Sequence, residues 1–100
     1  MKRIVDIVAD EDVYIAKGDT RVVPSKVKVE VPNGVVGILY EVPSVALRGV
    51  RMGSCLIESN MNVDVILTNV GNASFVAHKG EVVAKVVLQE LVQLKEPKQT

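Results

Sequence analysis

A series of short valine-rich segments, separated by turn signals, constrains the fold of this chain more than any other feature. Valine branches at Cβ, which restricts its side chain in a helix and favours extended backbone. Residues 27–31 alternate between valine and a charged residue, Lys28 or Glu30, which predicts a half-buried strand. Residues 35–42, 63–68 and 82–88 are apolar on both faces. That pattern predicts strands covered on two sides, by another sheet or by another subunit.

Turn signals lie between these segments, at residues 17–19, 32–34, 69–72 and 79–80. Short strands with regular turns predict an all-β sandwich or barrel. One hundred residues fit one domain. We expect this domain to span residues 1–96 and a frayed polar tail to follow at 97–100. Residues 88–97 have the spacing of a helix but also extend a strand, so both structures stay open.

Composition excludes several classes of partner. Twelve basic and twelve acidic side chains cancel, and aromatic residues make up only 3% of the chain. A nucleic-acid binder would need clustered cations or stacking rings, so we expect no nucleic-acid partner. No segment approaches the apolar length of a membrane span, and the N-terminal segment does not resemble a signal peptide. The single cysteine, Cys55, fits a buried side chain in a reducing compartment. We therefore expect a soluble, intracellular protein, cytoplasmic or nuclear.

The residues alone show little chemistry. His78 is the only histidine and Cys55 the only cysteine, so no zinc-site spacing exists. We expect His78 to be a turn residue, because it precedes a Lys-Gly pair. Ser44, Ser54 and Ser59 lack the G-x-S-x-G context of a nucleophilic serine, and no glycine-rich phosphate loop is present. The sequence therefore predicts neither a metal site nor a cofactor.

The order of segments resembles a known family. Residues 11–42, EDVYIAKGDTRVVPSKVKVEVPNGVVGILYEV, and residues 66–91, ILTNVGNASFVAHKGEVVAKVVLQEL, are similar to the two halves of the trimeric dUTPases. The matching scaffold positions are Pro32, Gly34, Gly37, Asn69, Gly71, Phe75, Gly80, Ala84 and Val87. The resemblance implies a β-clip fold, which is a distorted jelly-roll barrel of short strands, assembled as a homotrimer.

The family has five sequence motifs that bind and hydrolyse the nucleotide, and the first, fourth and fifth differ in how far they match this chain. Asp6 matches the aspartate of the first motif, which helps hold the metal-bound triphosphate in the family. The glutamine of the fourth motif is replaced by Lys85. The fifth motif, a glycine-rich arm, has no counterpart in the printed sequence.

The second motif, P-R-S-G in the family, supplies an arginine and a serine to the phosphates. Here the region reads EVPSVALRG, residues 41–49. The arginine is replaced by Val42 or Pro43, and the glycine by Ser44 or Val45, depending on the register. An apolar side chain cannot neutralise phosphate charge, and a Cβ crowds the backbone approach. Arg48 lies nearby in sequence but at a different position.

The third motif falls on a shortened loop. The family's water-activating aspartate corresponds to Leu56, and the tyrosine under the deoxyribose corresponds to Ser59. Leucine cannot accept a proton, so this register removes the general base. Glu58 is the nearest carboxylate and would share a strand face with Leu56. We expect Leu56 to point inward and fill the former pocket.

With four of the five motifs altered or absent, the sequence predicts a degenerate, non-enzymatic family member. Such a pseudoenzyme would serve as a viral or mobile-element structural protein, associated with a particle, or as a protein-interaction module. Its contact loop would carry Ser54, Glu58, Asn60 and Asn62. Of these, Glu58, Asn60 and Asn62 should be dispensable for folding. The protein partner stays unknown. The alternative is a nucleotide-binding or nucleotide-hydrolysing enzyme with rearranged chemistry, using Asp6, Glu58, and Lys85 or Arg48.

Overall fold

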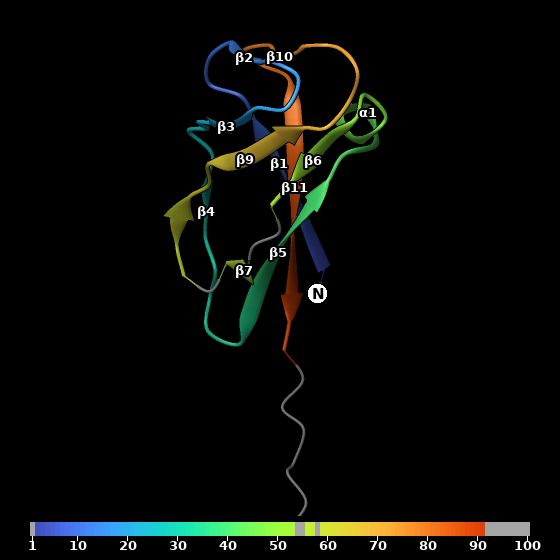
Figure 1. Cartoon of the computed structure of the whole chain (residues 1–100). Helices are drawn as coiled ribbons and strands as arrows, with labels where there is room; N and C mark the ends of the chain where they lie inside the picture. The colour runs from blue at the N-terminus through green and yellow to red at the C-terminus, as the bar shows by residue number, and fades with distance from the viewer. Residues whose placement is uncertain (1, 54–55, 58, 92–100) are drawn as a thin grey trace, which may run out of the picture.

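A computed structural model describes residues 2–53, 56–57 and 59–91, and in this part of the chain β-strands dominate (Figure 1). The single helix described is a short one, α1 (Pro43–Ala46). The all-β prediction is confirmed. The strands in chain order are β1 (Lys2–Val8), β2 (Val13–Ile15), β3 (Thr20–Val23), β4 (Lys28–Val29), β5 (Val35–Glu41), β6 (Val50–Met52), β7 (Leu56–Ile57), β8 (Met61–Asn62), β9 (Val65–Asn69), β10 (Phe75–Ala77) and β11 (Val82–Glu90).

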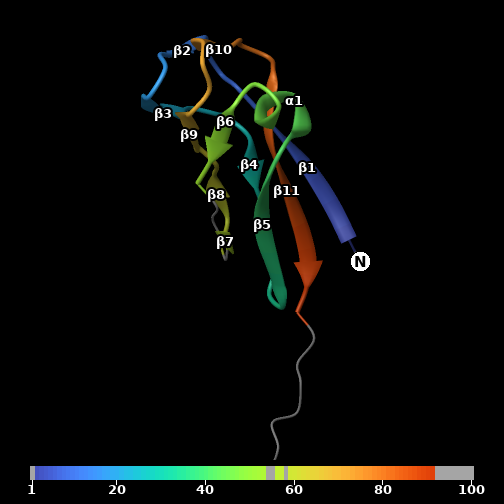
Figure 2. The ribbon, with the colours of Figure 1, turned by 45° about the vertical axis from the view of Figure 1, so that its right-hand side comes forward.

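The strands form two main antiparallel sheets and two small pairs. The larger sheet has the order β1-β11-β5-β7 and the second sheet the order β3-β9-β6, while β10 pairs with β2 and β4 with β8. Figures 1 and 2 show β1, β11 and β5 side by side, with β9 and β6 in a separate layer. The β2–β10 pair closes one end of these two layers. The second and the larger sheet are therefore the two walls of one core.

Side chains alternate between the core and the surface along the larger sheet, as the period of a strand requires. In β11, Ala84, Val86 and Leu88 are buried, whereas Lys85 is exposed and Val87 is half-buried. Buried side chains from both sheets make one hydrophobic cluster. Across the core the second sheet contributes buried residues that include Val23, Val50, Val65 and Leu67.

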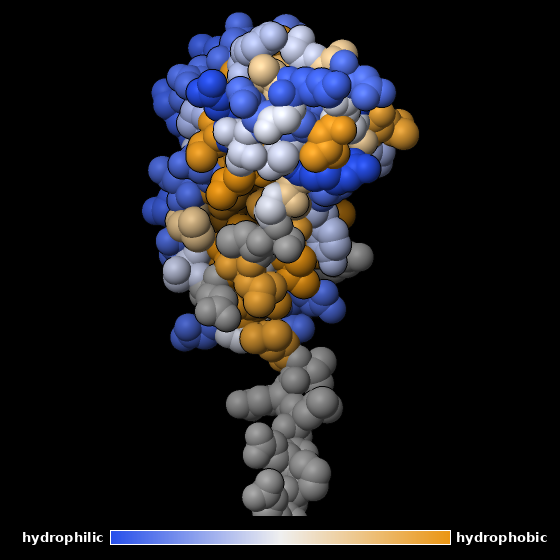
Figure 3. Space-filling view, in the orientation of Figure 1, coloured by the Kyte–Doolittle hydropathy of each residue, from blue (hydrophilic) through white to orange (hydrophobic). Residues whose placement is uncertain are grey.

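The apolar strands were expected to be covered on both faces, by another sheet or by another subunit, and within the described part of the chain they are covered on one face only. Ile66, on the second face of β9, is 50% exposed, and Val87 on β11 is only half-buried. These outer faces are left uncovered by the described part of this chain. Figure 3 also shows apolar side chains gathered over β5 and β7, while the end formed by β2 and β10 is mostly hydrophilic.

Several strands and turns that the sequence predicts are present in the structure. The alternation at residues 27–31 is confirmed, since Val29 and Val31 are buried while Lys28 and Glu30 are exposed, although only Lys28 and Val29 pair as β4. The predicted turns at 17–19, 32–34 and 79–80 are present. The open segment 88–97 continues as a strand to Glu90, and residues 92–100, including the expected tail, lie outside the described residues. Within the described residues, the structure contains no helix with the length and hydrophobicity that a membrane crossing requires.

Candidate functional site

The outer face of the larger sheet brings the first and fourth motif positions together. Asp6 on β1 lies opposite Lys85 on β11, and Lys85 lies opposite Tyr40 on β5. Lys85 Nζ is 3.8 Å from Asp6 Oδ1, and the two side chains are 47% and 54% exposed. A solvent-exposed ion pair of this kind is worth about 0–1 kcal/mol. Both charged groups can therefore exchange this contact for one with a ligand.

A second row on the same face is entirely apolar. Ile4 lies opposite Val87, Val87 opposite Ile38, and Ile38 opposite Leu56, so the row crosses all four strands. Ile4 and Leu56 are 57% and 62% exposed. The expectation that Leu56 points inward is therefore wrong. In β7 it is the next residue, Ile57, that is buried, because successive side chains of a strand point to opposite faces.

The second-motif turn begins where β5 ends. Val42 is the N-cap of α1, and Pro43 occupies the first turn, where its missing N–H removes no helical hydrogen bond. Val42 and Val45 are buried, whereas Pro43 and Ser44 are exposed. The two valines therefore anchor the turn in the core, in the region where the family has phosphate-binding groups.

A surface groove of about 500 Å³ runs beside this turn. It contains the exposed side of α1 and one cation, Arg51, whose Nη1 donates a hydrogen bond to the carbonyl oxygen of Ala46 at 3.0 Å. Sequence reasoning missed Arg51 because it lies on β6, outside every motif. The turn between α1 and β6 brings Arg51 back beside the helix, five residues after Ala46. The groove is lined by Glu41, Val42, Pro43, Ala46, Leu47 and Arg51.

The third-motif stretch is described only in part. Ile57 lies opposite Gly37, where an added Cβ would come within 3.1 Å of the Ile57 Cβ, so glycine permits this close strand pairing. Ser59 is exposed, and Asn62 is exposed opposite Lys28. Ser54, Cys55 and Glu58 lie outside the described residues. Their predicted roles, like the contact loop as a whole, stay predictions.

Asn60 has a structural role that the sequence did not reveal. Its Oδ1 accepts a hydrogen bond of 2.6 Å from the backbone N–H of Val31, on the segment that follows β4. This bond argues against the expectation that Asn60 is dispensable for folding, which stays a prediction.

Asn60→Ala is expected to lower the free energy of unfolding by about 1–3 kcal/mol, because it leaves a partly buried N–H without its partner. Asn62→Ala is the matched control, since Asn62 is exposed, and it should change stability by less than about 0.5 kcal/mol. Urea denaturation of the two variants checks this difference. Equal midpoints for Asn60→Ala and the parent would contradict the structural role.

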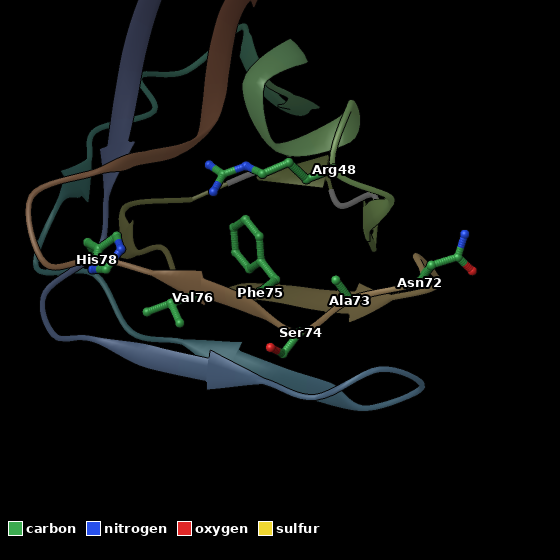
Figure 4. Close-up of a pocket in the computed structure, with 7 residues that line it drawn as sticks. All are labelled: Arg48, Asn72, Ala73, Ser74, Phe75, Val76 and His78. Atoms are coloured by element: carbon green, nitrogen blue, oxygen red, sulfur yellow. The ribbon is translucent and has the colours of Figure 1, made fainter.

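A second pocket, of about 420 Å³, lies between Arg48 and the segment that contains β10 (Figure 4). Arg48 extends over the ring of Phe75, with its guanidinium carbon 4.6 Å from the ring centre, and Nη2 donates to Glu81 Oε2 at 2.7 Å. Arg48 is therefore engaged with Phe75 and Glu81, not with the Asp6–Lys85 pair. His78 directly precedes a turn, as expected. The pocket is lined by Arg48, Asn72, Ala73, Ser74, Phe75, Val76 and His78.

The described residues contain no group of three or more His, Cys, Asp and Glu side chains that could hold a metal ion.

Comparisons with known proteins agree on one family. The dUTPase family model matches residues 3–100. A deoxyuridine 5'-triphosphate nucleotidohydrolase of Mycobacterium tuberculosis (strain H37Rv) is 33% identical over 103 residues, covering 92% of this chain and 65% of that protein. The Pol polyprotein of equine infectious anemia virus (strain Wyoming) is 26% identical over 85 residues, covering 83% of this chain and 7% of the polyprotein. This chain thus spans less than two thirds of these relatives' lengths.

Two solved structures show the same fold. The native dUTPase of equine infectious anemia virus has a TM-score of 0.80 at 22% identity, covering 99% of this chain and 97% of that chain. The dUTPase of Staphylococcus aureus phage phi11 has a TM-score of 0.81 at 17% identity, covering 97% and 81%. The resemblance inferred from spacing and turn glycines is confirmed, including the dUTPase-like type of the fold.

The expectation that this chain is not an enzyme is contradicted by the relatives named nucleotidohydrolases and dUTPases. That expectation depended on four altered or absent motifs, and within the third motif it depended on matching Leu56 to the catalytic aspartate across a shortened loop. A shift of two positions puts the carboxylate of Glu58 in its place. A viral source and a protein partner stay predictions.

Proposed function

Because this chain belongs to the dUTPase family, we propose that it is a nucleotide hydrolase that cleaves dUTP to dUMP and pyrophosphate. The observation that carries the proposal is the family match over residues 3–100, together with the 33% identity to a mycobacterial nucleotidohydrolase. The outer face of the larger sheet supports it, because that face holds the first-motif and fourth-motif residues 3.8 Å apart.

Glu58 is the residue we assign as the general base. It is the single carboxylate in residues 54–62, the stretch that corresponds to the water-activating motif. The next acid along the chain, Asp64, accepts a hydrogen bond from the backbone N–H of Ser25 at 3.2 Å and so has a structural partner. A carboxylate within reach of a water can accept its proton as the water attacks a phosphorus atom.

Cations and a carboxylate at the site fit the charge of the substrate. A triphosphate reaches a protein as its magnesium complex, and Mg²⁺ prefers oxygen ligands such as carboxylates. Asp6 supplies such a group on the exposed sheet face, and Lys85 beside it supplies a cation for phosphate. Arg51, in the groove beside Pro43, is a second cation and could compensate for the missing arginine of the second motif.

We also infer that the protein is a homotrimer, as the resemblance implies. The apolar row of Ile4, Val87, Ile38 and Leu56 supports self-association, because it crosses a whole sheet and none of its members is buried in the single chain. Exposed apolar patches of this kind mark interaction surfaces. A second copy of the chain would remove the row from water.

Calorimetry in the presence of Mg²⁺ tests the proposed function with three nucleotides. Injected dUTP should give a sustained heat of hydrolysis, dUMP a simple binding isotherm, and dCTP neither. The dCTP sample controls for a contaminating phosphatase, which would hydrolyse both triphosphates. Equal heats from dUTP and dCTP, or no heat from dUTP, would overturn the proposal.

A further inference from the structure

The Arg48 side chain connects three segments that are distant in sequence. Its Nε donates to the carbonyl oxygen of Ser44 at 3.1 Å, in the second-motif turn. Its Nη2 donates to Glu81 at 2.7 Å, directly before β11, and its guanidinium lies over the Phe75 ring of β10 (Figure 4). One side chain thus ties α1 to both β10 and the start of β11.

The partner of Arg48 is itself fixed in position. The other carboxylate oxygen of Glu81, Oε1, accepts a hydrogen bond from the backbone N–H of His78 at 3.1 Å. The Glu81 carbonyl accepts from the N–H of Ala9 at 2.9 Å, which ties it to the end of β1. Glu81 is therefore held by both β1 and the β10–β11 turn. Its side chain is 23% exposed, against 48% for Arg48.

The backbone after Arg48 is equally constrained. Gly49 has φ +81°, in the left-handed region, and an added Cβ would lie 2.6 Å from the Cα of Gly71. The Gly49 carbonyl accepts a hydrogen bond from Val70 at 2.9 Å. Gly71 and Val70 belong to the turn that follows β9. The buried side chain of Asn69 fixes this turn through hydrogen bonds with Ile15, Gly71 and Ala73. Arg48 therefore extends from a rigid junction of two turns.

We propose that Arg48 is a positioning residue, which fixes the second-motif turn relative to the fourth-motif strand and so shapes the site for the triphosphate of the substrate. This inference rests on the proposed function. Ser44, bonded to Arg48, is a second-motif position, and Lys85, on β11, follows Glu81 by four residues. The contacts of Arg48 are with Ser44, Glu81 and Phe75, and not with Asp6 or Lys85. Arg48 would therefore act on the site through the position of the α1 turn.

Lysine cannot reproduce these contacts. Arginine has a planar group with several donors, so it can bond to Ser44 and Glu81 while stacking on Phe75. Lysine has one compact ammonium group on a flexible chain. Arg48→Lys should therefore retain the ion pair with Glu81 but lose the fixed geometry of the α1 turn.

The test measures binding of two ligands to Arg48→Met, Arg48→Lys and the parent. We expect Arg48→Met to weaken binding of a non-hydrolysable α,β-imido analogue of dUTP by about 10- to 100-fold, because displaced contacts lose alignment with the phosphates. Arg48→Lys should lie between Arg48→Met and the parent. Binding of dUMP, which lacks the outer phosphates, should change less than about threefold, a difference that general destabilisation would not produce.

Arg21→Met is the matched control, because Arg21 is an exposed arginine on β3 with a 3.8 Å ion pair to Asp19. It should bind both ligands as the parent does. Unchanged affinity for the imido analogue in Arg48→Met would overturn the inference, and so would an equal loss for dUMP. A parent protein that binds neither ligand would overturn the proposed function itself, and the inference with it.

Discussion

Glu58→Gln is expected to lower kcat for dUTP hydrolysis by about 10²- to 10⁴-fold, because glutamine cannot accept a proton from the attacking water. The affinity for dUTP should change little, since the amide has nearly the shape of the carboxyl group. Steady-state kinetics of dUMP formation measures both quantities. The effect is expected to exceed that of any other single substitution in the third-motif stretch.

Glu11→Gln is the control for this experiment. Glu11 is an exposed acid before β2, so its substitution removes the same charge away from the sheet face that carries Asp6. It should retain the kcat of the parent. If Glu58→Gln also retained that kcat, Glu58 would not be the general base, and another acid would have to be sought.

Ile4→Glu is expected to convert the assembled protein into monomers. The parent should have a mass of about three times the 10.8 kDa chain in light scattering at micromolar concentration. Ile4 is 57% exposed in the single chain, so a glutamate there is compatible with folding. Between subunits it would be a buried, unpaired charge, which costs about 3–5 kcal/mol.

Ile66→Glu provides a matched comparison. Ile66 is 50% exposed and also lies on the outer side of a sheet, but on β9 of the second sheet. Its substitution should leave the mass unchanged. If Ile4→Glu kept the parent mass, or if the parent itself were monomeric, the apolar row of the larger sheet would not be a subunit contact.

Patterns that depend on local repetition were predicted well from the sequence. The alternation around Val29 and the turn glycines Gly18, Gly34 and Gly80 follow from the two-residue period of strands and from the need for positive φ. The same turns carried the resemblance to the dUTPases. These features could be predicted because each depends on a few neighbouring residues.

Features that depend on strand pairing could not be predicted. The helix α1 has only four residues, too few for a helical period, and Arg48 meets Glu81 across 33 positions. The outward direction of Leu56 follows from its pairing with Ile38, and the role of Asn60 from a bond to Val31. The register of the third motif could not be fixed from the sequence either, because the loop before it is shortened and a shift of two residues leaves a side chain on the same strand face.

Whether this protein hydrolyses dUTP is tested by ³¹P nuclear magnetic resonance of dUTP and Mg²⁺ incubated with the purified protein. With the parent protein, the three phosphorus signals of dUTP should be replaced by those of dUMP and pyrophosphate in equal amounts. The Glu58→Gln protein should leave the dUTP signals unchanged over the same time. Persistence of the dUTP signals with the parent protein would contradict the proposed function. So would the appearance of dUDP and inorganic phosphate, which would show cleavage at a different bond.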